Sequence, residues 1–482
     1  MSYKAPNPYV EKVPFKGKAT TSKSNSIMGI IGITPNGATD KAVLVTSWTE
    51  FIEKFAMGIS TPFMANAVLS HAVYGFFQNG GSQLYVARVV GTNSKKAEVV
   101  LAETTVKVMA KNEGEWGNSI KITVDDSGDA DKPYLFNVYY SDVLVESFMV
   151  ANSVTSSAYF ESSINTNSEY VSVSISGSAD NYTLKKIEDK VSLSGGADDL
   201  TSITDKDYTD RLTKFDSVHN LAAVGIPGQT TSSVVKALID YTKNKPVLPV
   251  LEFPETSVDA ATIIAFAKAN CAKSDTVLYG PCLTIVDPLS ASSKTKGISC
   301  VGHMMGVIAR TIDTKGEWNA AAGTEAVVNG VLGVETVFTD EDRGKLNEAG
   351  VNIILTKPNY GTVVWGARSQ SDDPELKYES NLTLNHTLRR NIDDAMQRFE
   401  FKNNGPSLWV DVTAEITGLM ETKRLAGAFA GATPETCYYV KCDETNNTQA
   451  TIDKGQVIVE VGYAANKPAE FIIVRVAHQI SN

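Results

Sequence analysis

The sequence predicts a multidomain α+β protein: an α/β core domain, an inserted β-sandwich or β-barrel domain, and a C-terminal α+β domain. The length of 482 residues exceeds the roughly 250–300 residues that one hydrophobic core usually holds. Apolar strand-like runs alternate with amphipathic helical runs on both sides of a stretch rich in Ser, Thr, Val, Asn and Tyr. Hydrophobic residues make up 43% and charged residues 21%, which excludes collagen-like, coiled-coil and largely disordered chains.

The first 26 residues form a polar arm that is rich in Pro, Lys and Ser. The arm carries five Lys and one Glu, although the whole chain has a formal net charge of −11. It is too polar to pack alone. We expect residues 1–26 to be either a disordered tail or an arm that becomes ordered on a neighbouring subunit.

Residues 27–104 read as the N-terminal α/β segment of the core. The apolar run 27–33 and the runs 42–45 and 84–90 predict strands. Residues 48–55 and 65–77 predict helices, the first of them capped by Ser47 or Thr46 with Glu50 as the capping-box partner of Ser47. A Gly-Gly turn at 80–81 then separates the second helix from the next strand.

The composition changes near residue 105, and residues 105–196 predict the inserted β domain. Short alternating runs such as IKITVDD and FNVYYSD are separated by clusters of Gly, Asp, Asn and Ser, which is typical of a small sandwich or barrel. The acidic run 125–131 lacks the spacing of a calcium loop, and we expect a solvated hairpin tip there.

Residues 197–358 predict an α/β domain, and residues 359–482 a C-terminal α+β domain. In the first, apolar strands alternate with amphipathic helices, which indicates a sheet covered on both faces. The second begins with TVVWGARS and predicts helices at about 384–401 and 408–424, followed by strands at 437–443, 456–463 and 470–478. In the middle strand Val457, Val459 and Val461 share one face, so that face is expected to cover a core.

Charge, cysteine usage and missing motifs exclude several functions. The acidic surface, with a pI near 5.1, repels nucleic acid and anionic lipid. Five Cys without a CxxC pair, no apolar leader and no run of about 18 apolar residues predict a protein folded in a cytoplasm without membrane contact. There is no GxxxxGK[ST], GxGxxG or HExxH, and His303 is expected to be packed in a helix. We therefore expect no enzyme activity, no metal and no cofactor.

Several segments, taken in order, resemble the sheath protein of contractile injection machines: myovirus tails, R-type bacteriocins and related devices. They are SIMGIIGITP at 26–35, VLVTSWTEFIEKF at 43–55, FFQNGGSQLYVARV at 76–89, AKNEGEWGNSIKI at 110–122, WGAR at 365–368, and the stretch 438–470 with CDETNNT, DKG and KPAE. Each motif alone is weak, but the ordered set spans nearly the whole chain.

The resemblance implies a fold and a function. The core would be similar in fold to subtilisin, here without the Asp-His-Ser triad, because neither Gly-Thr run (323–324 and 361–362) is followed by Ser. Six subunits would form a ring around an inner tail tube, and the rings would stack into a helical sheath that contracts without a nucleotide. Baseplate and tail terminator proteins would be further partners. Assembly is expected in the host bacterial cytoplasm, before incorporation into a virion tail or a released bacteriocin particle.

The resemblance also implies that extended arms link the subunits by strand pairing. The residues expected in this pairing are Ile27, Ile30, Ile31, Val457, Val459, Val461, Phe471 and Ile473. Linkers around 17–26 and 462–469 are expected to act as hinges. Contact with the inner tube is expected from the helix that carries Arg389, Arg390, Arg398 and Lys402.

Alternatives remain open at this point. The arginines could instead form ordinary surface pairs, Arg390 with Asp394 and Asp394 with Arg398. The chain could also be another self-assembling capsid or surface-layer protein, or a hydrolase on its α/β domain.

Overall fold

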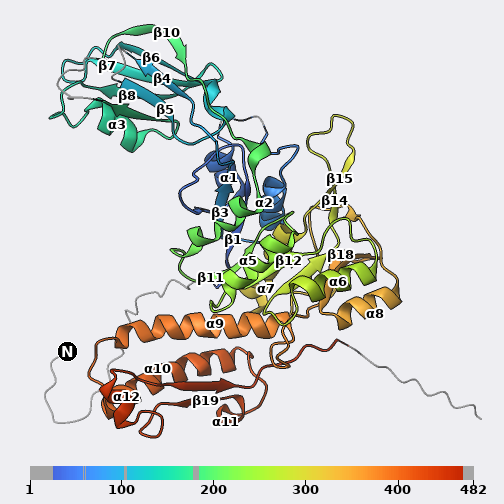
Figure 1. The fold of residues 1–482 in the computed structure, drawn as a ribbon. Helices are drawn as coiled ribbons and strands as arrows, with labels where there is room; N and C mark the ends of the chain where they lie inside the picture. The colour runs from blue at the N-terminus through green and yellow to red at the C-terminus, as the bar shows by residue number, and fades with distance from the viewer. Residues whose placement is uncertain (1–24, 58, 60, 102–105, 177–183, 471–482) are drawn as a thin grey trace, which may run out of the picture.

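The chain folds into three bodies stacked along one direction. The computed structural model describes residues 25–57, 59, 61–101, 106–176 and 184–470. Figure 1 shows the inserted β domain at one end, the α/β core domain in the middle and the C-terminal domain at the other end. The predicted multidomain α+β architecture is confirmed, whereas the specific likeness of the core to subtilisin stays a prediction.

An eight-stranded sheet forms the centre of the core domain, in the order β18-β17-β13-β12-β11-β1-β3-β2. The six inner strands, from β17 to β3, run parallel, while β18 and β2 pair antiparallel at the two edges. The strands are β1 (Ile27–Ile33), β2 (Val43–Val45), β3 (Leu84–Val89), β11 (Leu221–Gly225), β12 (Leu248–Glu252), β13 (Val277–Gly280), β17 (Val351–Lys357) and β18 (Gly361–Trp365).

Helices cover both faces of this sheet, as its apolar strands require. One face packs against α1 (Trp48–Phe55), α2 (Leu69–Gln78) and α7 (Val301–Lys315). The other packs against α4 (Asp205–Thr209), α5 (Ser232–Thr242), α6 (Ala260–Asn270) and α8 (Asp340–Glu348). Helix α7 approaches α2 so closely that a Cβ on Gly302 would lie 2.1 Å from the Ala72 carbonyl oxygen. A small sheet of β14 (Leu283–Val286), β15 (Thr295–Ile298) and β16 (Gly333–Val334) projects beside them.

The inserted domain contains two sheets around one hydrophobic core. One sheet contains β4 (Glu98–Leu101), β5 (Val106–Ala110) and β9 (Val171–Ile175), and the other β10 (Ile187–Ser192), β6 (Ile120–Asp126), β7 (Tyr134–Tyr140) and β8 (Val143–Val150). The acidic run lies in the hairpin between β6 and β7. Helix α3 (Phe160–Asn167) was not predicted, because its Ser- and Asn-rich sequence is typical of a loop.

The C-terminal domain packs two long helices and a short hairpin around a fourth apolar cluster. Its elements are α9 (Glu379–Met396), α10 (Pro406–Leu425), α11 (Pro434–Cys437), β19 (Tyr438–Lys441), α12 (Gln449–Asp453) and β20 (Glu460–Tyr463). Figure 1 shows α9 lying along the underside of the core, with α10 and the hairpin beneath it.

Two predicted domain boundaries differ from the structure. The boundary at 358 separates β17 from β18, although these strands pair over five residues, so the core domain extends to about Trp365. The boundary at 104 cuts through the inserted domain, because β4 pairs with β5 and belongs to its sheet. Both errors have the same origin. The boundaries were drawn from local sequence, whereas strand pairing joins a segment before each boundary to a segment after it.

Candidate assembly interface

Among the sheets that the described residues form, the one made by β19 and β20 has the fewest strands, and neither outer edge has a partner strand there. Its register pairs Val440 with Val461 and Lys441 with Glu460. No third strand joins the hairpin within the parts of the chain that the structure describes. A two-stranded sheet is only marginally stable in water. Each outer edge therefore presents backbone N–H and C=O groups that further strands can pair with.

One face of the hairpin packs on α10 and the other faces outward. The Tyr438 hydroxyl donates to Glu421 on α10 at 3.0 Å, and the Tyr463 ring lies 5.6 Å from that of Phe429. The outward face carries Tyr439, which is 54% exposed, and the segment before β20 exposes Ile458. The hairpin thus has a fixed position while Tyr439 on its outer face stays accessible.

The CDETNNT motif builds the polar turn that follows β19. The backbone N–H and hydroxyl of Thr445 donate to the Asp443 carboxylate at 2.8 and 2.6 Å. The buried Asn447 amide binds both backbone groups of Ile458, accepting from its N–H at 2.7 Å and donating to its C=O at 2.9 Å. Asn447 thus holds the approach to β20, which the sequence did not predict.

The C-terminal residues that were expected to pair with strands of other subunits do not all lie in strands of the structure. Val461 lies in β20, Val459 lies just before it and packs on the domain core, and Val457 is exposed. Phe471 and Ile473 lie outside the described residues.

The prediction for Ile27, Ile30 and Ile31 is wrong. Their strand β1 pairs with β11 on one side and β3 on the other, so both of its edges are occupied by the same chain. Ile30 and Ile31 are fully buried in the two cores that flank the sheet. An apolar run without alternation is typical of a central parallel strand, and this signal favoured burial over an open edge.

The predicted tube contact at Arg390 is wrong as well. Its guanidinium is buried and donates to the Pro246 carbonyl and to the Thr387 hydroxyl. Burial lowers the pKa of Arg390 to about 10, which the negative charges of Glu317 and Asp394 oppose. Arg390 therefore ties α9 to the core domain and is not accessible to a partner.

The other three basic residues are exposed. Arg389 donates to the Asn244 carbonyl at 3.3 Å, Arg398 forms an ion pair with Glu415 on α10, and the Lys402 ammonium lies 4.8 Å from the Phe399 ring. Asp394, the expected partner of the arginines, is contacted by His219 and Asn220 of the core domain at 2.9 and 3.1 Å. Arg389 and Asp394 on α9, and Arg398 just after it, thus contact neighbouring elements.

Two buried carboxylates fix the C-terminal domain to the core. Glu379, the first residue of α9, accepts from the Ala321 N–H at 3.2 Å and from the Thr383 hydroxyl at 3.0 Å. Burial raises the pKa of Glu379 to about 7. Glu317, which follows α7, forms an ion pair with Lys423 of α10. Both contacts hold the hairpin at a set position relative to the central sheet.

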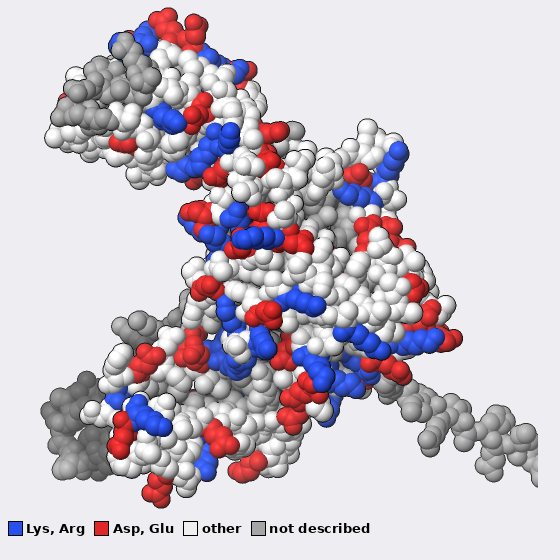
Figure 2. All heavy atoms as spheres, in the orientation of Figure 1, with Lys and Arg blue, Asp and Glu red and all other residues white. Residues whose placement is uncertain are grey.

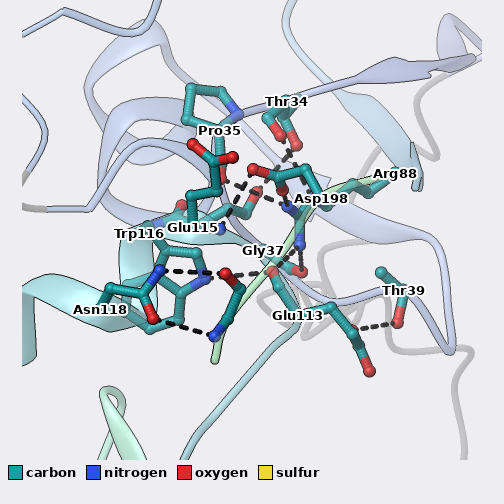
Figure 3. A network of polar contacts seen from close by, with 12 residues as sticks. Thr34, Pro35, Gly37, Thr39, Arg88, Glu113, Glu115, Trp116, Asn118 and Asp198 are labelled. Atoms are coloured by element: carbon teal, nitrogen blue, oxygen red, sulfur yellow. Dashed lines mark hydrogen bonds and ion pairs between the residues drawn. The ribbon is translucent and has the colours of Figure 1, made fainter. Parts of the chain in front are cut away.

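A buried arginine fixes the inserted domain at the opposite end of the core. Figure 3 shows the guanidinium of Arg88, from β3, surrounded by acceptors from three places: the loop after β1, the inserted domain at Glu113, and the segment that returns to the core at Asp198. It donates to five oxygens at 2.8–3.3 Å: the carbonyls of Thr34, Pro35, Gly37 and Glu113, and the Asp198 carboxylate.

At this junction the charge of Arg88 is balanced by that of Asp198, and the backbone leaves room for both side chains. Burial lowers the pKa of Arg88 to about 10 and raises that of Asp198, while the attraction between the two groups opposes both shifts. Arg88 therefore remains charged at neutral pH. Gly114 has a φ of 131°, and a Cβ there would lie 2.6 Å from the Asp198 carboxylate. Sequence reasoning missed this cluster, because Arg88 lies in an ordinary strand pattern and its acceptors are mostly backbone groups.

Two further buried titratable groups, Glu252 and His303, lie inside the core domain. Glu252 accepts the N–H groups of Gly228 and Cys300 at 2.6 and 3.0 Å, and burial raises its pKa. His303 is packed in α7 as predicted, and burial lowers its pKa to about 4. Over the described ranges, no group of His, Cys, Asp and Glu side chains suits a metal ion, and no helix is long and apolar enough to span a membrane. Figure 2 shows basic and acidic side chains interspersed on the visible face.

The comparisons with known proteins agree with this architecture. The phage tail sheath protein central domain matches residues 201–370, and the phage tail sheath C-terminal domain matches residues 371–479. The chain belongs to the phage tail sheath protein family. The boundary between the two matches lies between β18 and α9, where the core domain passes into the C-terminal domain. Sheath proteins are structural, and this chain is a structural subunit rather than an enzyme. No curated protein matches it.

Solved sheath proteins share the fold over almost the whole chain. The PVC sheath of an extracellular contractile injection system, in its contracted state, has a TM-score of 0.61 at 18% identity and covers 100% of this chain and 99% of its own. The contracted helical sheath of the anti-feeding prophage gives 0.60 at 19% identity, covering 99% and 100%. A sheath tail protein from Listeria innocua gives 0.64 at 13% identity, covering 91% and 95%.

Proposed function

We propose that this sheath protein is the repeating subunit of a contractile sheath, stacked as six-membered rings around an inner tube. The sheath contracts without nucleotide hydrolysis and drives the tube through a target envelope. The subunit is assembled in a bacterial cytoplasm and ends in a virion tail or a released bacteriocin particle. Its partners are other copies of the chain, the inner tube protein, and baseplate and terminator proteins.

The β19–β20 hairpin carries this proposal. It has two edges without a partner strand among the described residues, and both ends of the chain have sequences suited to supplying one. Residues 1–26 form a basic arm, and residues 470–478 read as an apolar strand. Strands added to an open edge gain a full ladder of backbone hydrogen bonds. Neighbouring subunits would thus remain linked while the rings rotate.

Contact with the inner tube is proposed for the exposed part of the charged set, Arg389, Arg398 and Lys402. These side chains lie on or just after α9, on the outside of the C-terminal domain. Charged contacts are weakened by salt and reform readily, which suits a surface that must release the tube during contraction.

Electron microscopy of the purified full-length chain, concentrated without partners, tests the proposal. We expect hollow helical tubes with six-fold rings, because nothing else in the sample competes for the open hairpin edges. Flat sheets or closed shells would contradict it and favour a surface-layer or capsid subunit. A variant with Arg389, Arg398 and Lys402 all changed to Glu should still form these tubes, but it should not co-assemble with an inner tube protein.

A further inference from the structure

We propose that an ion pair between Arg368 and Glu470 is a latch that sets residue 470 as the pivot from which the C-terminal segment leaves the subunit. The two residues belong to the WGAR and KPAE motifs, 102 positions apart in the sequence. The inference rests on the proposed function, since it concerns how the segment 471–482 is directed to another subunit. It places the pivot beyond the linker 462–469, where the sequence predicted a hinge.

The socket for Glu470 is held in place independently of that carboxylate. The backbone N–H and C=O of Arg368 are both bound by the side-chain amide of Asn352, at 2.7 Å each. One guanidinium nitrogen donates to the Asn347 carbonyl at the end of α8, at 2.9 Å. Because Asn352 is fully buried in β17, Arg368 is fixed to the core domain before the carboxylate arrives.

Glu470 fills the socket with two-point geometry. The Nε and Nη2 atoms of Arg368 donate to its two carboxylate oxygens at 2.7 and 2.5 Å. Both side chains are largely buried, with 11% and 16% of their surfaces exposed. Hydrogen bonds from Arg368, together with one from the Tyr378 hydroxyl, lower the pKa of Glu470. A fork of this kind, shielded from water, is stronger than a surface ion pair.

The segment between β20 and the latch is attached at both ends. Ala464 donates to the Cys437 carbonyl and accepts from the Ala430 N–H, both at 2.8 Å, and the Asn466 amide donates to the Gly427 carbonyl at 3.1 Å. Residues 464–470, which we term the strap, therefore lead from the C-terminal domain to the core domain. The strap carries the chain away from the hairpin of its own subunit, which favours donation of residues 471–482 to another copy.

Hydrogen–deuterium exchange of the strap in the full-length soluble subunit tests the latch. Glu470→Gln keeps the shape of the side chain but removes its charge, and strap amides should exchange about tenfold faster, as expected for loss of about 1.4 kcal/mol. Arg368→Lys keeps the charge but loses the fork, and should give a smaller increase. Glu325→Gln, which removes an exposed pair with Lys315, is the matched control and should leave strap exchange unchanged.

Assembly measurements test the latch and the proposed function independently of each other. Glu470→Gln should need a higher protein concentration to form tubes, because its C-terminal segment is no longer directed outward. Unchanged strap exchange in Glu470→Gln, or a loosened strap with tubes forming at the wild-type concentration, would overturn the latch. A chain that ends at Glu470 should keep a protected strap and form no tubes; tubes from this truncation would instead contradict strand donation by residues 471–482.

Discussion

The central sheet and the β19–β20 hairpin differ in how many of their strand edges are paired within the subunit. The central sheet has eight strands, helices on both faces, and six inner strands paired on both sides. The hairpin has two strands, one covered face and no further strand among the described residues. The first is complete within one subunit, whereas we propose that the second is completed by strands of other chains.

This difference separates stability from assembly in the molecule. Changes in the central sheet and at its junctions should alter the free energy of unfolding, because the inner strands are paired on both sides and their side chains are buried inside the subunit. Changes at the hairpin edges should leave the subunit folded and alter the polymer. Three predictions probe this distinction, in order of decreasing effect on stability.

The largest loss is expected at the junction of the core with the inserted domain. Arg88→Met keeps much of the side-chain volume but leaves Asp198 and four carbonyls without their donor. Breaking a buried ion pair in this way costs about 3–5 kcal/mol. Denaturant unfolding followed by circular dichroism measures the loss. Arg398→Met, which removes an exposed pair with Glu415, is the control and should cost no more than about 1 kcal/mol.

An intermediate effect that depends on pH is expected at Glu379. Because burial raises its pKa from 4.5 to about 7, the folded chain holds this proton over a pH range in which the unfolded chain releases it. The stabilisation is complete below pH 4.5 and is lost as the pH rises through 7, by about 3 kcal/mol in total. Glu379→Gln should reduce the decline in unfolding free energy between pH 5 and pH 8. A decline as steep as in the unaltered chain would mean that another group titrates.

The smallest effect on stability is expected from two substitutions that compare the central sheet with the hairpin region. Ile30→Val removes one methyl group from the central sheet and should cost about 0.5–1.5 kcal/mol. Val457→Ala removes two methyl groups beside the hairpin but should change stability by less than about 0.5 kcal/mol, since Val457 is exposed. Electron microscopy should show the reverse order, with fewer tubes for Val457→Ala. Equal stability losses in the two variants would show that the hairpin region is packed within the subunit like the central sheet.

The sequence predicted the elements better than the contacts between them. Helix 48–55 and strands 27–33 and 120–126 appear with the predicted bounds, because capping residues and apolar runs are local signals. The site was predicted less well. The unbroken apolar run around Ile30 indicated burial but did not show which strands pair with β1. The helical stripe that contains Arg390 does not show whether this residue faces solvent or the core. Only long-range pairing separates these cases, and it is absent from the local sequence.

The way the inserted domain is attached makes the protein modular. Its two connecting segments run antiparallel and are bridged at Lys95–Ala197 and Glu98–Ser194. Paired positions of this kind lie only about 5 Å apart, so a tight turn is long enough to close the core once the domain is removed. Asp198 would stay with Arg88, outside the excised part. Evolution or engineering can thus exchange this domain for another without breaking the fold of the core domain.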